Sequence, residues 1–257
     1  MRADVALVEQ GLCGSRTQAC LLIETGRVSV LRGPTQIPVQ KPSQTVAAAC
    51  VFCIAPSSVP HYVSRGGIKL AGALAQVGFN PADLNCVDFG QSTGGFTDCL
   101  LQAGAAHVVG FDVGKEQLHP CLREHPQVRF FEGVNLKDIK ARTWLRTLEQ
   151  QASHALPFQL AVADLSFISL VRVAKSLDAF LSSGCVCLYL VKPQFELGPE
   201  HVGKNGIVKM AEPLLQKLQA GISQTLLNLG YTVNSQFACT IAGSDGNQEY
   251  FVYATKN

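Results

Sequence analysis

A glycine-rich turn between an apolar run and a helical pattern is the segment best suited to hold a ligand. It reads Val-Asp-Phe-Gly-Gln-Ser-Thr-Gly-Gly-Phe over residues 87–96. Glycines there permit a positive φ and let a ligand approach the backbone closely. Asp112 ends the next apolar run, 22 residues after Gly90, close to the offset of about 20 residues at which an acidic side chain meets ribose hydroxyls in nucleotide-binding folds. The two features together favour an adenosine-containing cofactor, although the glycine spacing differs from the dinucleotide pattern G-x-G-x-x-G.

The elements that must position this turn alternate between strand and helix beyond residue 61. The expected strands are 85–90, 107–113, 128–132, 160–164, 186–191, 234–241 and 250–255, and the expected helices are 68–77, 96–103, 141–151, 170–181 and 214–229. Strands separated by helices imply right-handed crossovers and a mostly parallel sheet buried on both faces. A short glycine-rich turn before the last strand predicts one antiparallel hairpin at an edge. Ligands of such sheets bind beyond the carboxyl ends of the strands.

Residues 1–60 are typical of a separate unit. Two short helical patterns are followed by a β run at 27–30 and a segment interrupted by prolines, and the stretch 55–60, with two prolines and two serines, is the expected linker. This quarter carries five basic and three acidic residues, whereas the remainder is balanced, so the net charge of +2 arises here. With 47% hydrophobic and 16% charged residues the chain is globular rather than a polycation, and any nucleic-acid binding must be local.

The ten cysteines favour reduced thiols over disulfides or metal. Most lie inside apolar runs, and residues 1–4 do not resemble a signal peptide, so we expect a cytoplasmic protein. Cys50 and Cys53 have the spacing of half a zinc site, but no second pair follows at a suitable interval, and no metal is expected.

Five ordered segments give the chain a resemblance to a known family. They read SRGGIKL at 64–70, GQSTGGFTD at 90–98, DLSFISL at 164–170, VKPQFE at 191–196 and GNQE at 246–249. Together they resemble the TlyA family, also labelled hemolysin A, in which an S4 RNA-binding domain precedes an FtsJ-like methyltransferase domain. The resemblance implies an α+β S4-like domain with its linker over 1–60, and over 61–257 an α/β, Rossmann-like class I methyltransferase domain with a mostly parallel seven-stranded sheet.

The resemblance also implies an activity and its partners. The expected reaction is methylation of a ribose 2′-hydroxyl, that of a cytidine, in ribosomal RNA, with S-adenosyl-L-methionine as the cofactor and ribosomal RNA or a ribosomal subunit as the partner.

A catalytic tetrad of Lys69, Asp164, Lys192 and Glu249 is carried over from the FtsJ-like enzymes. A ribose hydroxyl is a poor nucleophile until its proton is drawn away, and a lysine flanked by carboxylates can position it and offset charge developing on its oxygen. Lys192 is assigned that role, whether as a neutral base or as a cation, while Lys69 and Glu249 are expected to orient the substrate.

Further site residues follow from the motifs. The residues expected at the cofactor are Asp88, Gly90, Ser92, Thr93, Gly94, Gly95, Phe96, Thr97, Asp112, Val113, Asn135 and Asp164. The residues expected at RNA are Arg2, Ser15, Arg16, Arg27, Arg65 and Lys204. For Asp88 a purely structural role, fixing the turn by hydrogen bonds to its amides, stays open. The segment 198–209 is interpreted as a lid or an RNA-contact loop, the alternative being a solvated loop.

Two other functions remain as alternatives. The hemolysin label suggests a membrane-active cytolysin, but the longest apolar stretch, residues 46–55, falls short of the ~20 residues that a spanning helix requires, and we expect no membrane association. A non-catalytic RNA-binding assembly factor would keep the fold, but all four tetrad residues are present.

Overall fold

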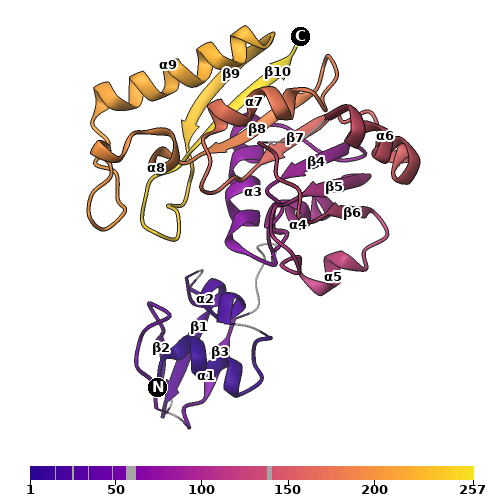
Figure 1. Cartoon of the computed structure of the whole chain (residues 1–257). Coiled ribbons are helices and arrows are strands. Elements are labelled where there is room, and N and C mark those ends of the chain that lie inside the picture. Colours follow the sequence, from indigo (N-terminus) through magenta and orange to yellow (C-terminus); the bar gives the residue numbers. More distant parts are fainter. Residues whose placement is uncertain (15, 25, 34, 48, 56–61, 138–140) are drawn as a thin grey trace. The chain divides into compact units, whose positions relative to one another are not determined.

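The chain divides into two compact units in the computed structural model, which describes all residues except 15, 25, 34, 48, 56–61 and 138–140 (Figure 1). The units are Met1–Arg65 and Gly66–Asn257. The division thus falls at Arg65, whereas the sequence predicts it at residue 60, and most of the predicted linker lies outside the described residues.

The first unit packs two helices against a small antiparallel sheet. The helices are α1 (Ala3–Glu9) and α2 (Arg16–Glu24), and the strands are β1 (Val28–Arg32), β2 (Thr35–Pro38) and β3 (Phe52–Ile54), in the order β2-β1-β3. Its core gathers small and aliphatic side chains from both helices and from β1, with Phe52 of β3. Two helices precede β1 as the sequence predicts, and β1 overlaps the predicted run at 27–30 but extends to Arg32. β2 escapes prediction because all four of its residues are exposed, so it has no apolar alternation.

The second unit is built on a sheet whose described strands number seven, in the order β6-β5-β4-β7-β8-β10-β9. The strands are β4 (Asn85–Phe89), β5 (His107–Phe111), β6 (Val128–Phe131), β7 (Leu160–Ala163), β8 (Val186–Val191), β9 (Tyr231–Ala238) and β10 (Tyr250–Lys256). The first five run parallel, and β10 is antiparallel to both β8 and β9. The expected mostly parallel sheet and its antiparallel edge hairpin are confirmed.

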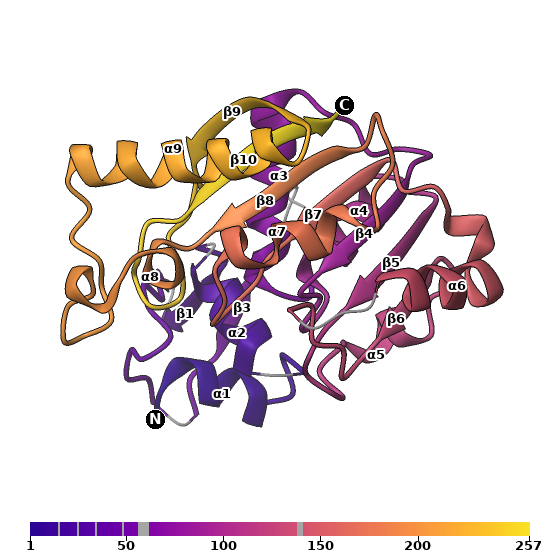
Figure 2. The same cartoon turned by 45° about the horizontal axis from the view of Figure 1, so that its top comes forward.

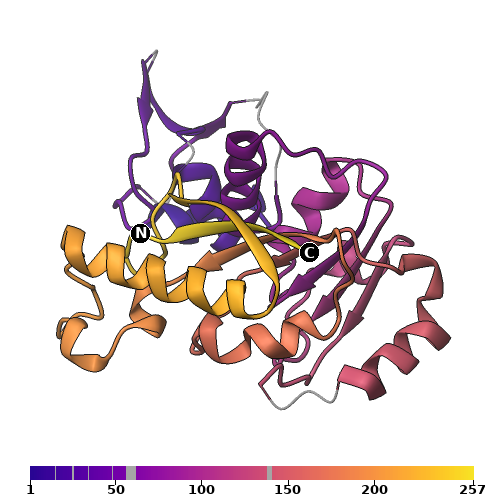
Figure 3. The same ribbon diagram turned by 90° about the horizontal axis from the view of Figure 1, so that it is seen from above.

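Helices cover both faces of this sheet. They are α3 (Arg65–Val77), α4 (Gly95–Gln102), α5 (Pro120–Arg123), α6 (Ala141–Gln151), α7 (Leu170–Asp178), α8 (Pro193–Glu196) and α9 (Glu212–Asn228), with 3-10 turns η1 (Ser153–Ala155) and η2 (Pro199–His201). α7 and α9 lie side by side on one face, and α6 shares their apolar cluster (Figures 2 and 3). On the opposite face the Phe96 ring of α4 stacks on Phe251 of β10.

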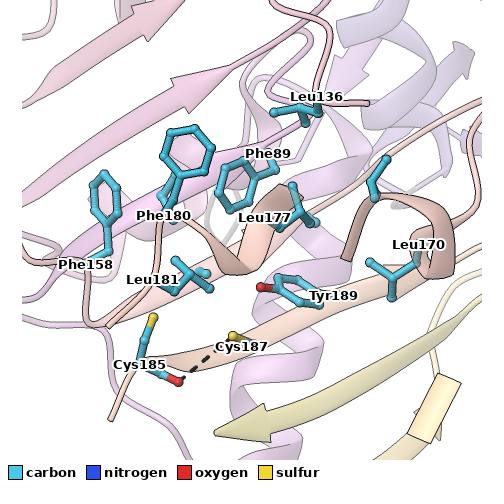
Figure 4. Packing of buried hydrophobic residues seen from close by; sticks show 14 of the residues in the cluster. Phe89, Leu136, Phe158, Leu170, Leu177, Phe180, Leu181, Cys185, Cys187 and Tyr189 are labelled. Carbon is cyan, nitrogen blue, oxygen red and sulfur yellow. Dashed lines mark hydrogen bonds between the residues drawn. The ribbon is translucent and has the colours of Figure 1, made fainter. Parts of the chain in front are cut away.

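The core between the sheet and α7 fixes where the strands end. Figure 4 shows the ring of Phe89 beside Leu177 of α7, with the rings of Phe180 and Phe158 following in the same layer. These side chains are almost wholly removed from water, and burial of each large apolar side chain contributes about 1.5–3 kcal/mol. Because the parallel strands are anchored in this layer, the loops at their carboxyl ends start from rigid positions.

Candidate active site

Three tetrad residues come together because their strands are neighbours. Asp164 follows β7 and Lys192 follows β8, and these strands pair in parallel. β10 runs back along β8 with Tyr250 opposite Val191, so Glu249, just before β10, meets the end of β8. Asp164 and Lys192, at the ends of two expected strands, therefore lie at adjacent strand ends.

Lys192 is held in place by its backbone and by two side chains. It precedes a proline that begins the single turn of α8, and a residue before proline is restricted to extended backbone, here with φ −108° and ψ 105°. Its Nζ lies 2.6 Å from Asp164 Oδ1 and donates to Ser166 Oγ at 2.8 Å. The side chains of Lys192 and Asp164 are 11% and 22% exposed, so both partners of the ion pair still reach solvent.

Lys69 and Glu249 form the second ion pair. Lys69 lies on α3, and its Nζ is 2.5 Å from Glu249 Oε2. Both side chains are buried, and burial raises the pKa of Glu249 while Lys69 and then Lys192 lower it. Asp164 acts on the same carboxyl in the opposite sense. The four charged groups are therefore close enough to interact, as the tetrad requires.

The glycine-rich turn lies beside Asp164. Gly90 has φ +85°, and a Cβ on it would come within 2.7 Å of the Asp164 carbonyl oxygen. Gly94 has φ +91°, and a Cβ there would collide with Leu122 at 2.3 Å. Only glycine combines these conformations with this close approach. At both glycines other protein atoms occupy the place of a Cβ, so the turn packs closely against the residue that follows β7 and against α5.

Asp112 stands at the end of β5 and is oriented toward the turn. Its Oδ2 accepts from the Ser92 amide at 2.7 Å and its Oδ1 from the Gly114 amide at 2.6 Å. A carboxylate oxygen can accept more than one hydrogen bond, so both oxygens keep capacity for ligand hydroxyls. Val113 next to it is 69% exposed, which leaves an apolar surface at the same strand end.

Asp88 is fully buried, and its Oδ2 accepts from the Thr97 amide at 3.1 Å and from Thr97 Oγ1 at 2.7 Å. The structural role left open for Asp88 is therefore present. Its Oδ1 has no hydrogen-bond partner among the described residues. Gln91 completes the group, because its Nε2 donates to Thr97 Oγ1 at 2.8 Å.

Two residues expected at the cofactor have a different role in this structure. The Phe96 side chain is 3% exposed because its ring packs against Phe251. Thr97 is fully buried, and both its amide and its hydroxyl donate hydrogen bonds to Asp88. Phe96 belongs to the hydrophobic face of α4 and Thr97 to its first turn. Both side chains therefore support the glycine-rich turn from the protein interior. Ser92 is exposed, Thr93 half-buried and Gly95 buried at the turn, and Asn135 is exposed after β6 with its Oδ1 capping the Lys137 amide.

The residues expected at RNA scatter over the chain. Arg2 and Arg16 both pair with Asp4, a fully buried side chain of α1, at 2.9 Å. These bonds hold the pKa of Asp4 well below its usual range, so the two arginines are at least partly structural. Arg27 donates to the Ala55 carbonyl at 2.6 Å, Arg65 begins α3, and Lys204 is exposed. Ser15 lies outside the described residues.

Sequence reasoning missed the residues that tie the loops together. Glu196 accepts from Ser169 Oγ at 2.6 Å and from the Leu170 amide at 2.5 Å, which caps α7 from the segment after β8. Asn247, 2% exposed, accepts from the Val208 amide at 2.8 Å and donates to the Gly206 carbonyl at 3.0 Å. Glu196 is an acid after a Lys-Pro turn, and Asn247 is an amide in a glycine-rich loop. Neither sequence pattern indicates which distant residue the side chain will contact.

The loop at 198–209 is a formed element rather than an unanchored lid. Gly203 and Ile207 share a backbone hydrogen bond of 2.9 Å, and Val202 bridges Val208. Asn247 then anchors the loop to the segment that carries Glu249.

Comparisons with known proteins agree with this geometry. The family model described as FtsJ-like methyltransferase matches residues 62–256. The chain is 37% identical over 252 residues, 98% of this chain and 88% of its relative, to the 16S/23S rRNA (cytidine-2'-O)-methyltransferase TlyA of Mycobacterium tuberculosis. It is 32% identical over 98% of its length to Hemolysin A of Brachyspira hyodysenteriae, covering 99% of that protein. A solved structure described as a hemolysin from Streptococcus thermophilus has a TM-score of 0.72, with 32% identity and coverage of 100% of this chain and 88% of that chain.

Two negative findings apply to the described residues alone. None of their helices combines the length and the apolar composition needed to cross a bilayer. No group of three or more His, Cys, Asp or Glu side chains among them is arranged around a point where a metal ion could bind.

Proposed function

The chain belongs to the TlyA family of FtsJ-like methyltransferases, and on that premise we propose that it methylates the 2′-hydroxyl of a cytidine in ribosomal RNA. The methyl donor of these enzymes is S-adenosylmethionine, which supplies an electrophilic methyl group on a positively charged sulfur. The observation that carries the proposal is the Lys192–Asp164 ion pair, at the ends of two adjacent strands and beside the glycine turn.

The residues of the turn fit this cofactor. Asp112 has acceptor capacity for the two ribose hydroxyls, and its orientation is fixed by two amides. The exposed Val113 supplies an apolar contact for an adenine ring. The unpartnered Oδ1 of Asp88 offers a buried acceptor for a cationic group. The positive φ angles of Gly90 and Gly94 shape the turn beside Asp164.

The tetrad would then act on the ribose. Lys192, held by Asp164 and Ser166, positions the 2′-oxygen and offsets negative charge as the hydroxyl loses its proton. The Lys69–Glu249 ion pair completes the charged site and orients the substrate. The oxygen attacks the methyl carbon as the bond from that carbon to sulfur breaks, and correct positioning supplies much of the rate.

RNA binding by the first unit, with its S4-like order of two helices and three strands, is part of the proposal. Phe167 adds an exposed aromatic ring near Lys192 in the second unit: it is 90% exposed, and bases stack on such rings. A ribosomal RNA substrate implies a cytoplasmic enzyme. A non-catalytic assembly factor would have no need for the paired charges of the tetrad.

The decisive experiment maps ribose methylations in ribosomal RNA from cells with and without this protein. We expect one or a few cytidine positions to lose their 2′-O-methyl group in its absence and to regain it when the purified chain and S-adenosylmethionine are added. An unchanged methylation map, together with no transfer to either subunit in vitro, would refute the proposal. Leakage of dye from liposomes would favour the cytolysin.

The same assay tests the role of Lys192. Lys192→Ala should slow single-turnover methyl transfer on the order of a hundredfold to ten-thousandfold, while the dissociation constant of S-adenosylmethionine stays near that of the wild type. Lys175→Ala, an exposed lysine on α7, is the control and should keep the full rate. A Lys192→Ala rate within about threefold of wild type, or about 0.65 kcal/mol, would remove Lys192 from the reaction.

A further inference from the structure

A groove of about 480 Å³ lies beside the proposed catalytic pair and has no role in the reaction as described so far. Its walls come from three loops at the carboxyl ends of β6, β7 and β8 and from the first turns of α7. Gln194, two residues after Lys192, and Phe167, three after Asp164, both line it. The volume is within the range of ligand pockets in proteins, roughly 300–1,000 Å³.

The apolar part of the groove suits a flat ring. Phe195 packs against Phe167 with ring centroids 5.2 Å apart, and Ile168 and Leu197 extend the same lining. Phe167 has φ +64°, a conformation that costs a bulky residue on the order of 1–3 kcal/mol. The ring of Phe167 is largely exposed and has Phe195 as its aromatic neighbour, so its free face is available to a ligand.

The charged part of the groove is positive. Lys137 and Arg172 line it, and neither side chain has a hydrogen bond or ion pair with any residue that the structure describes. The one acidic lining residue, Glu196, accepts from Ser169 Oγ and the Leu170 amide and also interacts electrostatically with Arg172. The groove thus presents two cations, one carboxylate that partly offsets them and an aromatic wall, and its net positive charge and its rings complement a phosphate and a base.

We propose that this groove binds a nucleotide that flanks the methylated one, with its base against Phe195 and its phosphate on Arg172 and Lys137. The inference rests on the proposed function and adds a second contact point on the RNA. A base held a few residues from Lys192 fixes the direction of the strand, so that the neighbouring ribose is presented to the tetrad. Such a site is single-stranded, because a paired base could not enter the groove.

The test uses the full chain and labelled ribosomal RNA from cells that lack the enzyme. Arg172→Glu and Lys137→Glu should each weaken RNA binding about tenfold, and each neutralised contact should lower the slope of log affinity against log salt by about one. Lys175→Glu is the matched control. This residue is exposed on the same helix but does not line the groove, and its substitution should change affinity less than threefold. S-adenosylmethionine affinity should stay unchanged in all three.

Each other outcome overturns the groove assignment. Equal losses in all three variants would show diffuse attraction to a charged surface, and no loss would exclude the groove. Weakened cofactor binding would make the groove part of the cofactor site. If the glutamate at position 172 disturbs folding, Arg172→Gln against Lys175→Gln gives the same comparison. Methylation by the wild type reports separately on the proposed function, because binding is read without turnover.

Discussion

At the scale of single residues, the fold changes the pKa of Asp88, an acid next to the glycine turn. Burial raises its pKa to about 7, against the smaller lowering effect of its hydrogen bonds from Thr97. Nearby Asp164 and Asp112 act in the same direction as burial. An aspartate in the unfolded chain titrates near 3.9, about three units lower.

The shift gives the stability of the second unit a pH dependence with a defined sign. Because the folded-state pKa lies above the unfolded one, the folded chain holds more protons between about pH 4 and pH 7. The free energy of unfolding should therefore fall as the pH rises through that window. Asp88→Asn keeps an acceptor for Thr97 but cannot ionise, so calorimetric melting between pH 5 and 8 should show a shallower decline than in the wild type.

A matched control separates Asp88 from the other acids. Asp83→Asn exchanges an exposed aspartate with φ +62°, a conformation that asparagine adopts readily, and it should follow the wild-type curve. If Asp88→Asn also follows that curve, Asp88 does not titrate in this range and its buried Oδ1 must have a partner.

Which residues carry charge chemistry was predictable from the motifs, and the order of the expected strands places Asp164 beside Lys192, but the pairing of Lys69 with Glu249 was not predictable. The resemblance names Lys69, Asp164, Lys192 and Glu249 without saying which lysine meets which acid. The pairing depends on the register of β10 against β8 and on the position of α3. Arg2 and Arg16 show the opposite case. Arginine is a residue type that commonly binds RNA, but in the structure both side chains form ion pairs with the buried Asp4. No sequence pattern indicates that pairing.

At the scale of elements, the turn after β4 is locked to β5 through one side chain. A Cβ on Gly110 of β5 would lie 2.0 Å from Gln91 Cδ, so the buried Gln91 side chain rests directly on the glycine backbone. From there its amide reaches Thr97. Gln91 therefore fills the space above Gly110 that a side chain at position 110 would need.

Gly110 and Gln91 should therefore be strongly coupled. Gly110→Ala would displace the Gln91 amide from Thr97 and destabilise the second unit by about 1–3 kcal/mol, a fall of roughly 2–4 °C in melting temperature per kcal/mol. In a Gln91→Ala background the same substitution should be neutral or stabilising, because Gly110 has no positive φ and alanine restricts the unfolded chain.

A double-mutant cycle of thermal or denaturant unfolding measures that coupling, for which we expect about 1–3 kcal/mol. Additive effects of the two substitutions would show that Gln91 does not occupy the space over Gly110. Gly221→Ala is the control: Gly221 lies on α9 with open space where a Cβ would be, and its effect should be the same in both backgrounds.

Most elements of the second unit were predictable because they are long and regularly patterned. β8 and α6 have the predicted bounds, and β4 to β7 begin where expected but end one or two residues earlier, where the chain turns away at Gly90, Asp112 and Asp164. The start of β9 was misplaced by three residues, at Tyr231 rather than Asn234, because this edge strand is half exposed and its apolar alternation is weak. α5 and α8 are single turns set by prolines, too short for any periodicity.

At the scale of the whole molecule, each unit has its own apolar core and its own buried charge. In the first unit Asp4 lies wholly inside while its two arginine partners keep 50% and 62% of their side chains exposed. The fold therefore relies on a carboxylate that must stay ionised. Its pKa is lowered first by the Arg2 hydrogen bond, so its stabilisation is present above the unfolded pKa and is lost as the pH falls toward the folded one.

Loss of the Asp4 carboxylate should impair the first unit and leave cofactor binding by the second unit intact. Asp4→Asn removes a charged acceptor for both arginines and should destabilise the first unit by about 1–3 kcal/mol, on the order of 10 °C for a unit of this size. The second unit keeps its sheet, so it should still bind S-adenosylmethionine with unchanged affinity and still melt at a higher temperature when the ligand is present. Methylation of ribosomal RNA should nevertheless fall, because the first unit supplies RNA contacts in the proposed function.

Glu9→Gln, the same exchange at an exposed position of α1, is the control. Full RNA methylation by Asp4→Asn at a temperature where calorimetry finds its first unit unfolded would show that the second unit recognises RNA alone.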